Sequence, residues 1–363
     1  MITLFCVRPK GFNLGNEVIF LGLSHLLREA FGTLVNIAQV PAEDTGDGAL
    51  CGLTARSVHE MNQYGHGVIV GGGNLYENGQ LRIDANALSA LRPPLMLFSL
   101  SYGRIYDHQH QLVRRTDAMP DAVIAALNAQ AAVSIARDDA TMGHLRAIGI
   151  DSARLGACPT LLLDRFPVLR PHLSGAAGGP LIAIRHPSLM NLPLRHQARL
   201  HDTVRDIART LEEQGFGSAR ILCHDMRDAS FAASLGDMEF VLPQDAYTLV
   251  ELLRCAPLVV TFRLHAFLPC VSVGTPAINI SYDERSHSLL RTIGLDRWDI
   301  DFVRTPDVAG AVRDRAARLG DLDALRSAAR PIWHGYEQVL RDGAAEFATL
   351  VRRYATGGSS TPA

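Results

Sequence analysis

The chain has 363 residues, 47% of them hydrophobic, and a formal net charge of −2 at pH 7. This length predicts roughly two domains, and the near-neutral, interspersed charge disfavours a nucleic-acid-binding protein, which would show clustered Lys and Arg. No apolar run approaches the roughly 18 residues of a transmembrane helix, and the start lacks the basic region of a signal peptide. The six cysteines form no C-x-x-C pair, so we expect free thiols, no zinc site and a cytoplasmic protein.

Near the start, a strand and a helix are joined by a turn with candidate ligand residues. Residues 2–7 predict the strand and residues 18–31 an amphipathic helix. Between them, Asn13, Gly15 and Asn16 lie where α/β proteins present backbone N–H groups to anions. The two asparagines are explained more simply as helix caps than as ligands.

Three consecutive glycines end the next buried strand. The segment 66–75 contains Gly71, Gly72 and Gly73, followed by Asn74. Glycines permit positive φ and the close approach of a ligand, and their alternative role is to leave room for a neighbouring helix. Because they lie at the carboxyl end of a strand, where ligands of parallel sheets bind, we favour a binding loop.

The first half continues with the same alternation of elements. Residues 95–100 predict a strand, residues 107–115 a helix, and residues 132–136 a further strand. This last strand ends at Arg137, which could bind an anion or pair with the neighbouring Asp138.

The second half restarts the alternation after a stretch rich in Pro, Gly and Arg. The strand predicted at 181–184 ends at Arg185, which is a further strand-end cation, and a later strand is expected at 219–223. Other polar residues at these strand ends are expected to be structural, namely His186, His224 and Asp225.

The stretch 256–276 carries the strongest chemical signal of the chain. It predicts a buried strand that places Arg263 and His265 at its carboxyl end, followed by a short apolar helix. If the extended conformation lasts through His265, the two side chains face one spot, because residues two apart in a strand point the same way. A guanidinium beside a titratable imidazole suits a small anion that must also be protonated. The alternative is that both residues pair with nearby acids and hold a loop.

Alternating strands and helices in both halves predict an α/β fold with parallel sheets. We expect two Rossmann-like domains that face each other across a cleft, with strand-end residues converging there. We predict a first domain over residues 1–167, a linker over 168–180 and a second domain over 181–335. A C-terminal helix over 336–354 is expected to pack back on the first domain, and a disordered tail covers 355–363.

Five motifs occur in the order in which a known family has them. They are Asn13-Leu-Gly15-Asn16-Glu17, Val70-Gly71-Gly72-Gly73-Asn74-Leu75, Ser134-Ile-Ala-Arg137-Asp138, Thr261-Phe-Arg263-Leu264-His265-Ala266 and Pro276-Ala-Ile-Asn-Ile-Ser-Tyr282-Asp283. Each motif alone is weak, but the ordered set is fairly specific. From residue 1 to about 300 the chain resembles the polysaccharide pyruvyl transferase family. The resemblance implies a GT-B-like architecture and transfer of the enolpyruvyl unit of phosphoenolpyruvate onto sugar hydroxyls, forming a pyruvate ketal, as in exopolysaccharide biosynthesis.

The resemblance also implies roles for individual residues. It implies that His265 is the general acid and that Arg263 and Arg137 bind the donor. It also matches Gly71–Gly73 to the family's glycine loop. Arg285 stands where the family often has Lys, and Asn16 where it often has Asp. We expect Arg185 and Arg285 to assist donor binding, and the first domain with Asn13, Gly15, Asn16 and Asn74 to face the acceptor.

The implied chemistry requires no metal and no cofactor, with phosphoenolpyruvate as a co-substrate. The acceptor would be a sugar, a glycolipid or another hydroxylated molecule. No nucleic acid and no integral membrane segment is expected, while peripheral membrane association and any oligomeric state are compatible with the sequence.

Two rival functions fit the same scaffold. One is a GT-B glycosyltransferase with a nucleotide-sugar donor, and the other is a non-catalytic glycan-binding relative. A dehydrogenase is disfavoured, because no G-x-G-x-x-G fingerprint follows a strand.

Overall fold

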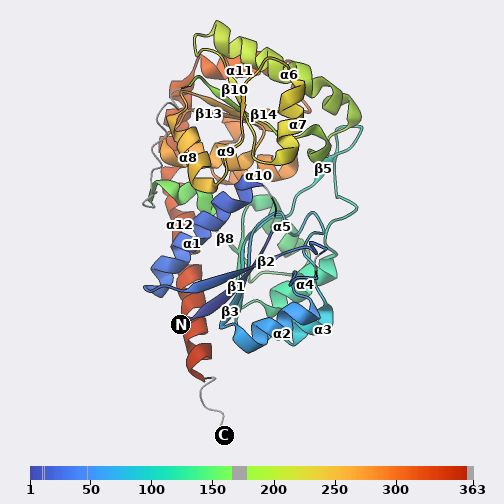
Figure 1. Cartoon of the computed structure of the whole chain (residues 1–363), viewed down its shortest axis with the longest axis vertical. Coiled ribbons are helices and arrows are strands. Elements are labelled where there is room, and N and C mark those ends of the chain that lie inside the picture. The colour runs from blue at the N-terminus through green and yellow to red at the C-terminus, as the bar shows by residue number, and fades with distance from the viewer. Residues whose placement is uncertain (10, 12, 47, 166–177, 358–363) are drawn as a thin grey trace.

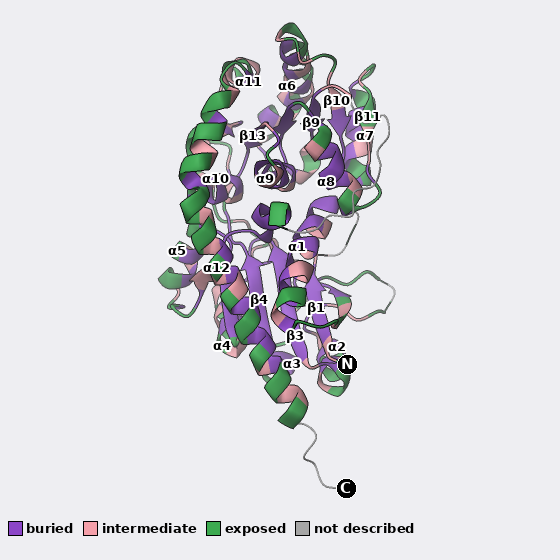
Figure 2. Ribbon diagram, turned by 90° about the vertical axis from the view of Figure 1, so that its left-hand side faces the viewer, coloured by how far each residue is buried: buried purple, intermediate pink, exposed green. Residues whose placement is uncertain are grey.

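The computed structural model describes residues 1–9, 11, 13–46, 48–165 and 178–357. They form two α/β domains, one above the other in Figure 1, each built on a six-stranded parallel sheet. Figure 2 shows that the strands are buried while the outer helices expose one face. Strands of a parallel sheet are covered on both faces, which explains their continuous apolar sequences.

The first domain has the strand order β2-β1-β3-β4-β7-β8. In β1, Leu4 and Cys6 point to the core shared with the second domain, whereas Phe5 and Val7 point to a core on the other face. This alternation follows from the two-residue period of a strand. Its strands are β1 (Thr3–Arg8), β2 (Asn36–Pro41), β3 (Gly67–Gly73), β4 (Leu95–Leu100), β7 (Val133–Ala136) and β8 (Arg154–Leu155). Its helices are α1 (Leu14–Phe31), α2 (Ala55–Tyr64), α3 (Ala85–Ser89), α4 (Asp121–Gln130), α5 (Asp139–Ala147) and the 3-10 helix η1 (Pro159–Arg165).

The second domain has the strand order β11-β10-β9-β12-β13-β14. The chain fills one half of this sheet outward from β9 and then the other half outward from β12, so the topological switch point lies between β9 and β12. Its strands are β9 (Leu181–Ala183), β10 (Arg220–Leu222), β11 (Phe240–Val241), β12 (Val259–Thr261), β13 (Ala277–Ser281) and β14 (Ile300–Asp301). Its helices are η2 (Pro187–Leu189), α6 (Leu194–Glu213), α7 (Met226–Ser234), α8 (Ala246–Cys255), α9 (Leu264–Val273), α10 (Glu284–Thr292), η3 (Asp296–Trp298) and α11 (Val308–Ala316).

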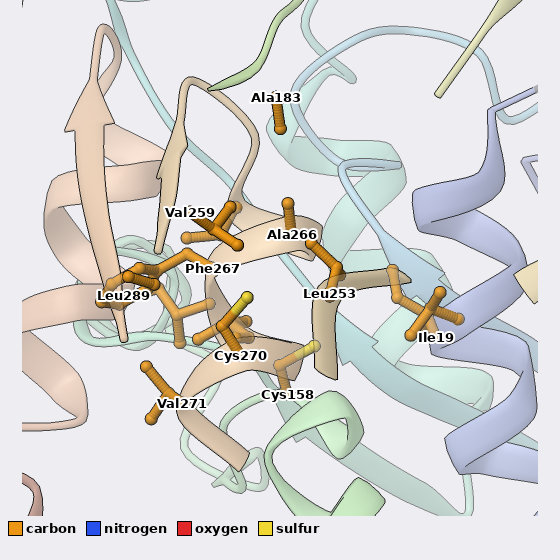
Figure 3. Packing of buried hydrophobic residues seen from close by; sticks show 14 of the residues in the cluster. Ile19, Cys158, Ala183, Leu253, Val259, Ala266, Phe267, Cys270, Val271 and Leu289 are labelled. Atoms are coloured by element: carbon orange, nitrogen blue, oxygen red, sulfur yellow. The ribbon is translucent and has the colours of Figure 1, made fainter. Parts of the chain in front are cut away.

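Helices α1 and α9 join the two domains. Helix α1 belongs to the first domain but packs against α8 and α9 of the second, and one hydrophobic core runs through both domains. Figure 3 shows the buried side chains of α9 lying among residues of neighbouring elements, including Ile19 of α1, Cys158, Leu253 of α8 and Val259 of β12. This packing fixes the N-terminal ends of α1 and α9 close to each other.

The sequence predicts a long helix over residues 321–354, and the observed helix is slightly longer at both ends. Helix α12 (Leu319–Gly357) is continuous, so the predicted boundary at residue 335 falls inside a helix, and residues 355–357 of the predicted tail are helical. The helix runs from the second domain down along the first (Figure 1), where Phe347 and Val351 lie against Gly67. Residues 358–363 of the tail and 168–177 of the predicted linker lie outside the described residues.

The helix predicted at 107–115 is wrong. Strands β5 (Ile105–Tyr106) and β6 (Leu112–Val113) form an antiparallel hairpin there. The hairpin is held by the second domain, because the Tyr106 hydroxyl donates to Asp301 Oδ2 at 2.7 Å and His110 Nε2 lies 2.9 Å from His196 Nε2. Contacts with a distant part of the chain therefore override the local helical pattern.

Candidate functional site

A cavity of about 330 Å³ lies between the domains, at the carboxyl ends of their strands. This volume falls in the range of small-molecule sites, and the position beside the β9/β12 switch point is where α/β sheets bind ligands. Ten of the residues predicted for the site line this cavity: Asn13, Gly15, Asn16, Gly73, Asn74, Arg137, Arg185, Arg263, His265 and Arg285.

Arg263 reaches the cavity by a route that differs from the prediction. Strand β12 ends at Thr261 and α9 begins at Leu264, with Arg263 as the N-cap residue, so the extended conformation does not last through His265. The guanidinium of Arg263 donates to the buried carboxylate of Asp228 and to the carbonyl of Ile184. Burial lowers the pKa of Arg263, whereas Asp228 opposes that shift. Arg263 therefore does pair with an acid, yet it still contributes to the cavity wall.

His265 lies in the first turn of α9 with a non-helical backbone (φ −86°, ψ 19°). Its Nε2 atom is buried and has no hydrogen-bond partner among the described residues. Desolvation lowers the pKa of His265 well below 6.5, and the positive charges of Arg137, Arg285, Arg263 and Arg185 lower it further. Burial and these charges therefore favour the neutral imidazole, and its Nε2 atom is available to a ligand.

Arg285 is the second residue of α10, whose N-cap is Asp283. Its guanidinium has two carboxylate partners. It donates to Asp283 Oδ2 at 2.6 Å and to Glu77 Oε1 at 2.9 Å, and these pairs raise its pKa. Burial raises the pKa of Glu77 to about 7, although Arg285 opposes the shift. Glu77 comes three residues after Asn74, but its sequence neighbourhood gives no sign that it meets a residue 208 positions later.

Arg137 is almost fully buried at the end of β7. Its Nη2 atom donates to Ser101 Oγ at 2.5 Å, and its Nε lies 3.8 Å from Asp138 Oδ2. The two interpretations of Arg137 are thus compatible, since one group lines the cavity and also faces its neighbour's carboxylate.

Arg185, which follows β9, differs from the other three arginines. It lines the cavity but has no ion pair or hydrogen bond with any residue that the structure describes. Its charge is therefore the least neutralised in the site.

The glycine loop divides into two parts. Gly71 and Gly72 do not line the cavity, because they face α1, where a Cβ at Gly72 would lie 2.3 Å from Ile19 Cγ2. For these two, the structure supports the alternative explanation, room for a neighbouring helix, and they do not join the other predicted site residues in the cavity. Gly73, with φ +91°, and Asn74 do line the cavity.

The turn before α1 supplies the first domain's wall. Asn13 is the N-cap of α1 and accepts from the Gly15 N–H at 3.1 Å, as expected for a cap. Gly15 brings the helix backbone against the histidine, since a Cβ at Gly15 would lie 3.0 Å from His265 Cβ. The capping role and the place in the cavity coexist.

Several lining residues were not singled out as site residues from the sequence. Asn78 and Gln80 follow the glycine loop and hydrogen-bond to each other at 2.6 Å. His224, which the sequence suggested to be structural, also lines the cavity. Asp225 caps α7 and pairs with Arg227, as a structural residue would, and His186 bonds Ser188. Across the described residues no cluster of three or more His, Cys, Asp or Glu could hold a metal ion.

The fold is similar to those of nucleotide-sugar enzymes. UDP-GlcNAc 2-epimerase from Neisseria meningitidis bound to UDP-GlcNAc aligns with a TM-score of 0.56 and 9% identity, over 98% of this chain and 100% of that chain. S. aureus MnaA with UDP aligns at 0.55 and 12% identity, over 90% of each chain. Glycosyltransferase VinC in complex with dTDP aligns at 0.50 and 17% identity, over 97% and 100%. The two facing Rossmann-like domains thus define a GT-B-like α/β protein.

The sequence assigns the family. The pattern of the polysaccharide pyruvyl transferases matches residues 13–284, well over half of the chain, and the protein belongs to that family. Family membership makes it a transferase. Comparison with curated proteins gives no match. The described helices include none that is long and apolar enough to cross a bilayer.

Proposed function

We propose that the protein transfers the enolpyruvyl unit of phosphoenolpyruvate to a hydroxylated sugar acceptor, forming a pyruvate ketal and inorganic phosphate. The observation that carries this proposal is the convergence of Arg137, Arg185, Arg263 and Arg285 around His265 in one cavity of a family member. Two of these arginines follow strands β7 and β9, and the other two begin helices after β12 and β13.

The charge of the site supports a donor with two anionic groups. Phosphoenolpyruvate carries a carboxylate and a phosphate on a three-carbon frame, and arginine binds both groups through paired N–H donors. Arg185 offers an unneutralised charge, while Arg263 and Arg285 are held in position by the carboxylates of Asp228 and Asp283. Positive charge on the phosphate would also stabilise it as the leaving group.

The reaction requires a proton on carbon before the acceptor attacks. In the proposed sequence His265 gives its proton to the methylene C3, the double-bond electrons form the new C–H bond, and C2 becomes electrophilic. A hydroxyl oxygen of the acceptor bonds to C2 and its proton returns to the imidazole. Phosphate then departs with the electrons of its C–O bond. The second hydroxyl closes the ketal, and its proton leaves with the phosphate.

The first domain's wall suits a hydroxylated acceptor. Five amide side chains line it, namely Asn13, Asn16, Asn74, Asn78 and Gln80, and amides can both donate to and accept from hydroxyls. Among the described lining residues Tyr282 is the one Phe, Tyr or Trp, so the cavity offers little aromatic surface for a nucleotide base. This feature favours a sugar acceptor with phosphoenolpyruvate over the rival nucleotide-sugar donor.

The test combines purified protein, phosphoenolpyruvate and a panel of glycosides, with phosphate release and acceptor mass as readouts. Active protein should add the mass of a pyruvate ketal to one acceptor. His265→Gln should lower turnover by roughly 10²- to 10⁴-fold, the usual contribution of an acid–base group. Arg185→Gln should weaken donor binding. Arg209→Gln should change neither turnover nor donor binding, because this exposed arginine lies outside the cavity and its ion pair among the described residues is with Asp206.

Two outcomes would contradict the proposal. One is full turnover in His265→Gln with the fold intact. The other is thermal stabilisation by a nucleoside diphosphate with none by millimolar phosphoenolpyruvate, which would point to a nucleotide-sugar donor.

A further inference from the structure

His224 is a buried histidine that the proposed chemistry does not use. It follows β10, where its backbone N–H donates to Asp228 Oδ2 at 3.0 Å and its carbonyl accepts from the Leu14 N–H at 3.0 Å. The residue is thereby fixed between α7 of the second domain and α1 of the first.

The ring of His224 has two polar atoms without partners. Its side chain is completely buried and lines the cavity, yet neither Nδ1 nor Nε2 makes a hydrogen bond to any described residue. A neutral imidazole carries one N–H donor and one lone pair, and leaving both unsatisfied in the interior costs free energy. Because His224 lines the cavity, a ligand bound there can satisfy both atoms. His265 Nε2 is in the same condition. We refer to His224 and His265 as the histidine pair.

Positive charge faces the histidine pair from most neighbouring elements. Arg263, at the start of α9, and Arg185, after β9, act on both rings, while Arg137 and Arg285 act on His265. Burial and these charges lower the pKa values of both histidines well below 6.5. Most carboxylates nearby are engaged with arginines: Asp228 with Arg263, Asp283 and Glu77 with Arg285, Asp138 beside Arg137, Asp225 with Arg227 and Asp117 with Arg115. Glu43 also lines the cavity.

We propose that His224 is a second histidine of the anion site, and that an anion entering among the four arginines brings a proton onto the histidine pair. Burial and the positive field together keep the rings neutral; the anion cancels the field, and it gives the new N–H groups an acceptor that offsets the cost of burial. The proton is shared within a coupled pair. The inference rests on the proposed function only in taking phosphoenolpyruvate as the natural anion. It explains how an acid that burial and neighbouring arginines hold neutral becomes charged when its substrate binds.

The experiment measures protons taken up when sulfate binds. Sulfate is the probe because it does not titrate near pH 7, so any proton comes onto the protein. Calorimetry in HEPES and in Tris, which differ in ionisation enthalpy, gives the proton count from the difference in binding heat. We expect uptake of roughly one proton per sulfate at pH 7, and correspondingly tighter binding as the pH falls.

Variants assign the proton to residues. His224→Gln and His265→Gln keep a donor and an acceptor but cannot titrate, and each should reduce the uptake by at least half. His186→Gln is the matched control, because that histidine bonds Ser188 and does not line the cavity. Glu77→Gln is also needed, since the carboxyl has a pKa of about 7 and faces Arg285. The number of protons that Glu77→Gln takes up per sulfate should match that of the unmodified protein to within about a third.

Every measured proton count either supports or overturns the proposal for His224. Full uptake in His224→Gln, or loss of uptake in Glu77→Gln alone, overturns the proposal, as does sulfate binding without any uptake. If His224→Gln does not fold, as judged by circular dichroism, the smaller His224→Asn is measured with the same expected loss. Proton uptake with sulfate in a protein that shows no pyruvyl transfer would retain this inference and refute the proposed function, so the two fail separately.

Discussion

Replacing Asp228 by Asn tests how strongly the site depends on one buried carboxylate. Its oxygens accept from the His186 N–H at 2.9 Å, from the His224 N–H at 3.0 Å and from the Arg263 guanidinium. Asn keeps the shape, but its NH₂ group must face a donor, and Arg263 loses its counter-charge. Removing one partner of a buried ion pair costs about 3–5 kcal/mol. We therefore expect the free energy of unfolding to fall by about that amount.

The assay is urea unfolding followed by circular dichroism and by tryptophan fluorescence, because Trp298 is buried in the second domain. Asp225→Asn is the matched control on the same turn. Asn caps a helix as well as Asp does, and the lost partner Arg227 is exposed, so the cost should stay within about 1 kcal/mol. A difference between the two variants smaller than about 1 kcal/mol would refute the argument from burial.

Three further predictions concern other parts of the molecule. Phe347→Ala should lower the free energy of unfolding by about 3–5 kcal/mol, because Phe347 is fully buried between α12 and β3. Phe240→Ala is the control, at a residue 47% exposed, and should lower it by less than about 0.5 kcal/mol. Equal losses in urea unfolding would contradict this packing. Gly15→Ala should change the free energy of unfolding by no more than about 1 kcal/mol. It should lower turnover roughly 10- to 100-fold, because the new methyl group displaces His265. Gly143→Ala is the control, since Gly143 has open space around it, and it should keep full turnover. The folded chain holds the histidine pair neutral, so below pH 6.5 the unfolded chain binds more protons and the free energy of unfolding should fall as the pH decreases. A variant with Gln at both positions should show a weaker dependence of this free energy on pH. The same dependence in the variant and the unmodified protein would contradict the lowered pKa values.

The parts of the site predicted from the sequence are those that depend on chain position alone. Arg137 and Arg185 were placed at the ends of strands, and the structure has both at the ends of β7 and β9. The apolar runs before them are buried strands whose carboxyl ends face a cavity. Such placement follows from local pattern, because a buried strand must end in a turn and its last polar residue must lie at the sheet edge.

The predictions that failed needed information from elsewhere in the chain. The segment 107–115 has a helical pattern, but its hairpin is fixed by Asp301 and His196 of the second domain. His265 is in a helix rather than a strand, because β12 ends after three residues where it pairs with β9 and β13. Gly72 faces α1 and does not line the cavity.

The sequence by itself determined two Rossmann-like halves, the family and the cationic character of the site. Hydrophobic runs, glycine turns and ordered motifs are local properties that survive without coordinates. The tertiary structure alone decided which residues meet. Placing β9 beside β12 brings Arg185 next to Arg263, and domain packing brings His224 to the same cavity. These contacts join residues tens to hundreds of positions apart, so they depend on strand order and packing and leave no trace in local sequence.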